Sequence, residues 1–162
     1  MIVTVQLSDG QLPSFSSSAA LITVAGERML LQKRDEKSSI FFPGYLGLFG
    51  GGIEGGEGPL VTIVREIREE LSIGVEPQRF ELETVIEFSS VHLSNGEPRR
   101  RYFYKLDLGV EEFQRIQLRE GQRIESFSFT DLPSIDAVVP TDLMPLLMFV
   151  ASQKGKQINP LP

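Results

Sequence analysis

Three glutamates of one predicted helix have the residue type and spacing for metal chemistry. Glu66, Glu69 and Glu70 are related as i, i+3 and i+4, so a helix places their carboxylates on one face. Like charges so close together destabilise a bare helix. A hard divalent cation such as Mg²⁺ would compensate, because it takes oxygen ligands and is often shared with substrate phosphates. The alternative is a solvated acidic face with Arg65 and Arg68 as partners.

The helix that would position these carboxylates is predicted from Pro59 to about Leu71. Proline suits the first turn of a helix, where its missing N–H would be unpaired in any case. Apolar residues recur at three- and four-residue steps and form one stripe for burial: Leu60, Ile63, Val64, Ile67 and Leu71. A predicted strand at 46–49 and a glycine-rich turn from Gly50 precede the helix, an order that commonly presents N–H groups to phosphates.

Gly51, Glu57 and residues 65–73 together resemble the sequence box of the Nudix (MutT-like) hydrolases. The box reads Gly-x5-Glu-x7-Arg-Glu-U-x-Glu-Glu-x-Gly-U, where U is aliphatic, and six of its fixed residues match here. Ser72 stands where the box has its last glycine. Glycine at that point suits a left-handed helix end. We therefore expect an altered helix end, with Gly74 as the replacement cap, and no loss of metal binding.

The resemblance implies an α/β fold, namely a Nudix-like α/β/α sandwich with a mixed β-sheet between helices. The order of predicted elements agrees with such a sandwich. Further strands are predicted at 20–24, 29–33, 79–88, 101–108 and 124–130, and a closing helix at 141–152. The runs 79–88 and 101–108 are predicted to form a β-hairpin around a turn at 94–98.

Three parts of the chain are expected. Residues 1–17 are predicted to be an N-terminal extension, with a strand at 2–7 and a serine-rich loop at 14–18. Residues 18–153 are the expected Nudix domain, and 154–162 a tail that frays.

The resemblance also implies a reaction and a cofactor. Nudix hydrolases cleave the pyrophosphate linkage of nucleoside diphosphate derivatives with Mg²⁺, for which Mn²⁺ can substitute. By position in the box, Glu66, Glu69 and Glu70 would be metal ligands, and Glu66 is the candidate general base. The backbone of Gly51 would lie close to metal or phosphate, since glycine has no side chain to prevent that approach.

Other family positions suggest supporting residues. Glu57 and Arg65 would hold the loop and helix together through an ion pair. A further metal ligand is expected late in the chain, where Arg119-Glu120-Gly121-Gln122 resembles a Glu-Gly-Gln element of MutT-like members. Glu120 is the candidate and Glu125 the reserve, and a surface glutamate is the alternative for Glu120.

Candidate substrate contacts come from three places in the sequence. Arg34 ends a predicted strand at a position where MutT-like members have a base- or phosphate-contacting arginine, or it is simply exposed. Phe42, with Phe41 and Tyr45, has an aromatic face that could stack on a base, or it packs within its loop. Asp142 is a candidate acceptor for a base edge or a helix cap. Two further features are expected to be solvated. They are the arginine run 99–101, whose alternative is contact with phosphates or a partner, and His92, whose alternative is a catalytic role.

Three functions remain open at this stage. The first is a pyrophosphohydrolase of (d)NTP-type substrates that gives a monophosphate and pyrophosphate. The second is a hydrolase of nucleotide sugars or ADP-ribose-like conjugates, and the third is a non-catalytic nucleotide-binding Nudix domain. The complete set of three glutamates argues against the third. The proline past the box that ADP-ribose-type members tend to have is absent, which favours the first.

Composition limits the kinds of site and the cellular location that we expect for this chain. The chain has 162 residues, no cysteine and a net charge of −6, so disulfides and thiolate metal sites are excluded and a large nucleic-acid footprint is not expected. No apolar run approaches the length of a membrane span, and the N-terminus lacks the pattern of a secretory signal. We expect a cytoplasmic protein that acts on a small nucleotide as a monomer or homodimer.

Overall fold

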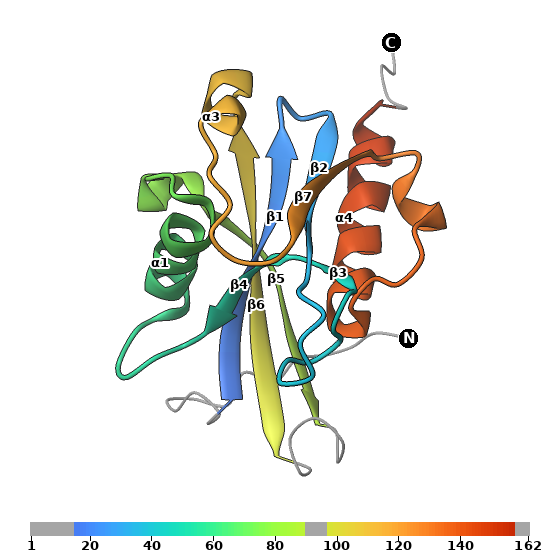
Figure 1. Cartoon of the computed structure of the whole chain (residues 1–162). Helices are drawn as coiled ribbons and strands as arrows, with labels where there is room; N and C mark the ends of the chain where they lie inside the picture. The colour runs from blue at the N-terminus through green and yellow to red at the C-terminus, as the bar shows by residue number, and fades with distance from the viewer. Residues whose placement is uncertain (1–14, 90–96, 158–162) are drawn as a thin grey trace.

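The computed structural model describes residues 15–89 and 97–157, in which one mixed sheet lies between helices (Figure 1). The strands are β1 (Phe15–Val24), β2 (Arg28–Lys33), β3 (Leu46–Gly47), β4 (Phe49–Gly52), β5 (Glu81–Ser89), β6 (Pro98–Leu108) and β7 (Arg123–Ser128). The helices are α1 (Pro59–Leu71), α3 (Val110–Gln114) and α4 (Pro140–Gln157), with 3₁₀ turns at Pro77–Arg79 and Leu132–Ser134.

The sheet is organised around β1. Its order is β3-β2-β1-β6-β5, while β4 also pairs with β1 and β7 with β2. The β1–β6 ladder is parallel and the other ladders are antiparallel, which makes the sheet mixed as predicted. One edge of β1 is shared: its first half pairs with β4 and its last residues pair with β2. The expected hairpin of β5 and β6 is present as an antiparallel pair.

Helices α1 and α4 cover opposite faces of the sheet (Figure 1). Successive residues of a strand point to opposite faces, and β1 supplies both cores in this way. Ala20 and Ile22 join the core under α1, whereas Ala19 and Leu21 join the core under α4. The predicted α/β/α sandwich is therefore confirmed.

Helix α1 has the predicted bounds and the predicted apolar stripe. Ile63, Ile67 and Leu71 are fully buried against the sheet, and Leu60 and Val64 pack beside them. The helix ends at a residue in the left-handed conformation, as the box requires. That residue is Ser72 itself, with φ 55° and ψ 30°, so the expectation that Gly74 replaces the cap is wrong.

Several element boundaries differ from the sequence predictions. Ser16–Ser18 belong to β1 and not to a loop, because their backbone pairs with Gly51, Gly52 and β6. Gly50–Gly52 continue strand β4 and do not form a turn, and the predicted strand 46–49 is divided between β3 and β4. Helix α3 was not predicted.

The C-terminal helix also differs in its limits. It begins at Pro140, so Thr141 and Asp142 lie inside its first turn and do not cap it. It continues to Gln157, so the expected tail from residue 154 begins within a helix. The predicted strand at 2–7, His92 and most of the turn at 94–98 lie outside the described residues. Within the described ranges, none of the helices has the length and apolarity needed to cross a membrane.

Candidate functional site

The glycines of β4 bring the backbone of the sheet against helix α1. A side chain on Gly50 would collide with the Ser18 carbonyl of β1, and the φ of Gly50 is +132°. A Cβ on Gly51 would lie 2.6 Å from Cδ of Glu66. Gly51 therefore leaves the space that the Glu66 carboxylate occupies.

Glu57 and Arg65 form the ion pair expected between the loop and the helix. Arg65 Nε lies 2.9 Å from Glu57 Oε1, and Arg65 Nη2 lies 3.0 Å from Oε2. Thr62 donates its hydroxyl to the same Oε2 at 3.0 Å. The guanidinium of Arg65 is the main reason that the pKa of Glu57 falls to about 2. Arg65 also donates to the Gly52 carbonyl at 3.1 Å, so it joins the loop, the helix and β4.

The three box glutamates differ in their surroundings. Glu69 is the exposed member, and Glu66 is mostly shielded, with side-chain exposures of 56% and 13%. Arg65 Nη1 contacts both, at 3.1 Å from Glu69 and 2.8 Å from Glu66. Glu70 is 5% exposed and accepts the Gly50 N–H at 2.8 Å. Burial raises the pKa of Glu70 to about 8 despite that bond, and burial also raises the pKa of Glu66.

The carboxylate oxygens of the three box glutamates are the kind of ligand that a hard divalent cation prefers, although these oxygens do not converge on one point. Among the described residues, no three acidic or histidine side chains converge closely enough to form a ready metal site. The carboxylates of Glu66 and Glu69 accept hydrogen bonds from Arg65, and that of Glu70 accepts one from the Gly50 N–H. A nearby cation favours the ionised form of a carboxylate, and the stabilisation is largest where the carboxylate is buried and has few positive neighbours. The residues therefore fit Mg²⁺ or Mn²⁺ by their chemistry.

Glu120 lies in the loop before β7, near the box glutamates. Its charge contributes to the raised pKa of both Glu66 and Glu70, which places its carboxylate within electrostatic range of them. The buried side chain of Gln32 links the two regions, since its Nε2 donates to the Glu120 carbonyl at 3.0 Å and lies 3.4 Å from Glu70 Oε1. Glu125 lies on β7 and pairs with Arg123. The structure thus brings Glu120 toward the box.

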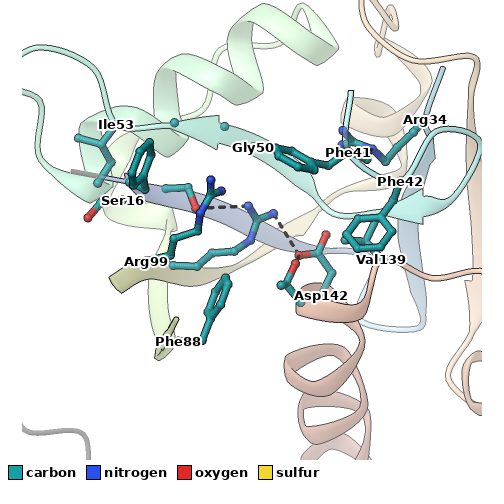
Figure 2. A pocket seen from close by; sticks show the side chains of 16 residues that line it. Ser16, Arg34, Phe41, Phe42, Gly50, Ile53, Phe88, Arg99, Val139 and Asp142 are labelled. Atoms are coloured by element: carbon teal, nitrogen blue, oxygen red, sulfur yellow. Dashed lines mark hydrogen bonds and ion pairs between the residues drawn. The ribbon is translucent and has the colours of Figure 1, made fainter. Parts of the chain in front are cut away.

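A pocket of about 440 Å³ opens beside the glycines (Figure 2). Its lining combines the glycine segment Gly50–Gly52 with aromatic and cationic side chains. The predicted residues Arg34, Phe42 and Asp142 all line it, although Asp142 is about a hundred positions from the other two in the sequence. Arg34 Nε donates to the Phe41 carbonyl at 3.0 Å, and the ring of Phe42 lies 5.5 Å from that of Tyr45. Both residues are therefore held within their loop while they face the pocket.

Asp142 is almost completely buried, and both its oxygens have protein partners. Oδ2 accepts the Leu48 N–H at 3.0 Å, and Oδ1 lies 3.1 Å from Arg101 Nη2. The carboxylate thus joins the start of α4 to β6 and to the segment before β4. Figure 2 shows Asp142 at the start of α4, beside the pocket. Its geometry suits a residue that holds Arg101 at the pocket.

The sequence analysis missed part of the pocket wall. Arg99 and Arg101 of β6 line it, whereas Arg100 points to the other side and pairs with Glu87 at 2.7 Å. The expectation of a solvated arginine run is therefore wrong, because strand alternation separates the three side chains and buries Arg100. The Arg99 guanidinium lies 4.9 Å from the ring centre of Phe15 and 5.7 Å from that of Phe41. Alternation along 98–108 was the signal available for Arg99 and Arg101.

Solved structures with a similar fold include proteins named as MutT or Nudix hydrolases. The chain is similar to a MutT NUDIX hydrolase from Burkholderia pseudomallei, with 25% identity, a TM-score of 0.63 and coverage of 85% of this chain and 98% of that one. The E. coli ORF135 protein gives a TM-score of 0.69 at 22% identity, with coverage of 91% and 96%. A bifunctional NMN adenylyltransferase/ADP ribose pyrophosphatase from Francisella tularensis, complexed with AMP and a Mn ion, gives 0.66 at 17% identity, with coverage of 88% and 42%.

The family model of the NUDIX domain matches residues 15–146. The chain therefore belongs to the NUDIX family, whose hydrolases act on pyrophosphate bonds and generally use divalent metals. A comparison with the curated proteins found no match. Structural neighbours carry different activities in their names, among them an Ap4A hydrolase from C. elegans and a dihydroneopterin triphosphate pyrophosphohydrolase from E. coli.

Proposed function

We propose that the protein is a divalent-cation-dependent hydrolase of nucleoside triphosphates that releases a nucleoside monophosphate and pyrophosphate. One observation carries the proposal: the carboxylate site and the pocket share the glycine segment of β4. Gly51 lines the pocket and leaves the space for the Glu66 carboxylate. A nucleoside in the pocket would therefore extend its phosphates along the glycines toward Glu66, Glu69 and Glu70.

The proposed reaction is the addition of water to a phosphorus of the α,β bridge. The new P–O bond forms as the bridging P–O bond breaks, and the two products share the oxygens of the substrate and the water. The obstacle is charge, because an anionic chain gains further charge at its oxygens in the transition state. A cation held by Glu66, Glu69, Glu70 and Glu120 would neutralise that charge and make a bound water more acidic.

The chain's own residues have separate proposed roles around this reaction. Glu66 lies at the junction of helix and glycines, so we assign it the acceptance of a proton from the attacking water as well as metal binding. Glu57 and Arg65 hold the loop, helix and β4 in one frame through their paired bonds. This frame keeps the carboxylates fixed during the reaction, which favours catalysis by preorganisation.

The pocket favours a planar, anionic substrate. Arg34 and Arg99 provide positive charge, and Phe42 provides an aromatic face for a base. Arg101 is paired with Asp142, so we propose that Asp142 positions Arg101 and does not itself accept a base edge. Arginine planes and aromatic rings together suit a nucleobase and its attached phosphates.

The test is a hydrolysis screen with Mg²⁺ over nucleoside triphosphates, oxidised ones included, and over nucleotide sugars and ADP-ribose. Released pyrophosphate and monophosphate are measured separately. We expect pyrophosphate release that is lost in the double variant Glu69→Gln, Glu70→Gln. The matched control Glu27→Gln, Glu111→Gln removes the same charge at exposed positions and is expected to keep the activity.

The products also identify the competing functions. Two monophosphates without pyrophosphate would replace the proposal with a hydrolase of nucleotide conjugates. Tight nucleotide binding without turnover on any substrate would replace it with a binding domain. Activity that persists in the Glu69, Glu70 variant would contradict the role given to the box glutamates.

A further inference from the structure

Ser72 departs from the family box and makes a contact that the family's glycine could not make. It adopts φ 55° at the end of α1, a left-handed conformation that strains serine and that glycine accepts readily. Its Oγ accepts a hydrogen bond of 2.7 Å from Arg119 Nε. The strained backbone conformation thus accompanies a short side-chain contact to the loop before β7.

That loop is attached to the end of α1 by its backbone as well. Arg119 N–H donates to the Glu70 carbonyl at 2.8 Å, and Gln117 N–H donates to the Leu71 carbonyl at 3.0 Å. Arg119 directly precedes Glu120, so these two hydrogen bonds anchor the backbone next to Glu120. The carbonyls of a helix's last turn lack partners within the helix, so they are natural acceptors for such a loop.

The loop is held from a second side by β2. Gln122 N–H donates to the Lys33 carbonyl at 2.8 Å, and Gln32 Nε2 donates to the Glu120 carbonyl at 3.0 Å. Gly121 has φ +80°, and a Cβ there would lie 2.8 Å from Gln32 Cγ. Glu120 is therefore placed between two anchored residues, with Arg119 and Ser72 on the α1 side.

The guanidinium of Arg119 is oriented by two acceptors. Its Nε contacts Ser72 Oγ, and its Nη2 donates to Gln117 Oε1 at 2.8 Å. Without the hydroxyl, the Nε loses its acceptor on α1, and an exposed arginine side chain would regain its rotamer freedom. The link from the Ser72 side chain to the loop would then be lost.

We infer that Ser72 is a positioning residue, whose hydroxyl holds Arg119 and thereby fixes Glu120 toward the carboxylates of α1. The inference rests on the proposed function, in which Glu120 is a metal ligand. It gives the serine a role that the glycine of the family box cannot perform. It also separates two effects of this residue, a backbone strain and a side-chain contact, that variants can measure independently.

The first test uses Ser72→Gly and Ser72→Ala in the full chain without metal or substrate. Glycine removes both the strain and the hydroxyl, whereas alanine keeps the strain and removes only the hydroxyl. The control is Ala25→Gly, because Ala25 has φ 51° in the hairpin between β1 and β2, far along the chain from the loop. We expect Ser72→Gly and Ala25→Gly both to raise the melting temperature, since each relieves a left-handed residue.

Hydrogen exchange in the loop 117–122 shows whether the Ser72 hydroxyl positions this loop or whether serine occupies the position without a role. Amide hydrogen exchange at Gln117, Arg119 and Gln122 is expected to become about tenfold faster in both Ser72 variants and to stay unchanged in Ala25→Gly. The Kd for Mn²⁺, followed by electron paramagnetic resonance, is expected to rise about tenfold in the Ser72 variants, as for other residues that orient a metal ligand.

Arg119 variants test whether the contact itself is responsible. Arg119→Lys keeps a donor for the hydroxyl and is expected to retain part of the Mn²⁺ affinity, whereas Arg119→Met has no donor and is expected to lose as much as Ser72→Ala. The double variant Ser72→Ala, Arg119→Met should be no worse than either single variant, because both changes break one contact.

Wild-type exchange rates and Mn²⁺ affinity in the Ser72 variants would overturn the inference. Additive losses in the double variant would also overturn it. If the wild-type protein binds no Mn²⁺, the proposed function fails, but the metal-free exchange rates still decide whether Ser72 fixes the loop. The two failures are therefore distinguishable.

Discussion

Replacement of Gly51 by alanine is the most direct test of the join between β4 and α1. The added Cβ would lie 2.6 Å from Cδ of Glu66, whereas non-bonded carbon atoms normally approach to about 3.5–4.0 Å. The carboxylate must therefore retreat by about 1 Å. Gly51 lacks the positive φ found at Gly50, so its backbone accepts alanine without strain, and the three atoms nearest to the added Cβ all belong to Glu66.

A displacement of about 1 Å in an active-site group can lower the rate by about 10²-fold. This corresponds to about 2.7 kcal/mol in the activation barrier. The effect on unfolding should be much smaller, about 0.5 kcal/mol, because the group that moves is the flexible end of a side chain. The expected result is a large loss of kcat with little change in the melting temperature.

Gly55→Ala is the matched control. This glycine lies in the loop between β4 and α1, outside the pocket lining, and no atom lies within 4 Å of the position its Cβ would take. Steady-state pyrophosphate release with Mg²⁺ is the assay, with thermal unfolding measured on the same samples. The reasoning is refuted if Gly51→Ala retains wild-type kcat, or if Gly55→Ala loses as much activity as Gly51→Ala.

Three further predictions concern other parts of the molecule. Glu70→Gln removes a buried carboxylate, so we expect the melting temperature without metal to be at or above that of wild type. Addition of Mg²⁺ should not raise the melting temperature of this variant. A rise as large as that of the wild-type protein would contradict metal binding by Glu70. Arg79 holds the pKa of Glu112 at about 2, below its ordinary 4.5, so the ionised carboxylate stabilises the fold above pH 4.5 and that stabilisation is lost as pH falls toward 2. Glu112→Gln should therefore lower the free energy of unfolding by about 1 kcal/mol at pH 7, and urea titrations should show the difference disappear at low pH. Ile67→Ala leaves a cavity between α1 and the sheet and should cost about 3 kcal/mol in the same titrations, whereas Val61→Ala, at an exposed site of the same helix, should cost less than about 1 kcal/mol.

The sequence predicted helix α1 and the ion pair of Glu57 with Arg65 well because local signals agree there. Pro59 marks the start, the apolar stripe marks the buried face, and the glutamates lie off that stripe. Family spacing then related Glu57 to Arg65, and the structure shows that pair with two hydrogen bonds. These features are set by residues close together in the chain, so periodicity and spacing report them directly.

The remaining features depend on partners that are distant in the chain. Ser16–Ser18 have the composition of a loop, yet β4 and β6 supply ladders on both sides and make them a strand. Arg99 and Arg101 reach the pocket only because β6 lies parallel to β1. The contact between Ser72 and Arg119 spans 47 positions of the sequence, so no local pattern predicts it.

The position of β1 between β4 and β6 has a consequence for how such an enzyme can change during evolution. The backbone of β1 pairs with the glycine segment on one side and with the pocket strand β6 on the other. Side chains of β6 can be exchanged while the β1–β4 ladder, made by main-chain atoms, keeps the glycines and Glu66 in place. In the proposed function, the reaction and the choice of substrate are thus carried by opposite edges of one strand. Under that proposal, mutation of β6 could redirect the enzyme to a new substrate without changing the residues that break the bond.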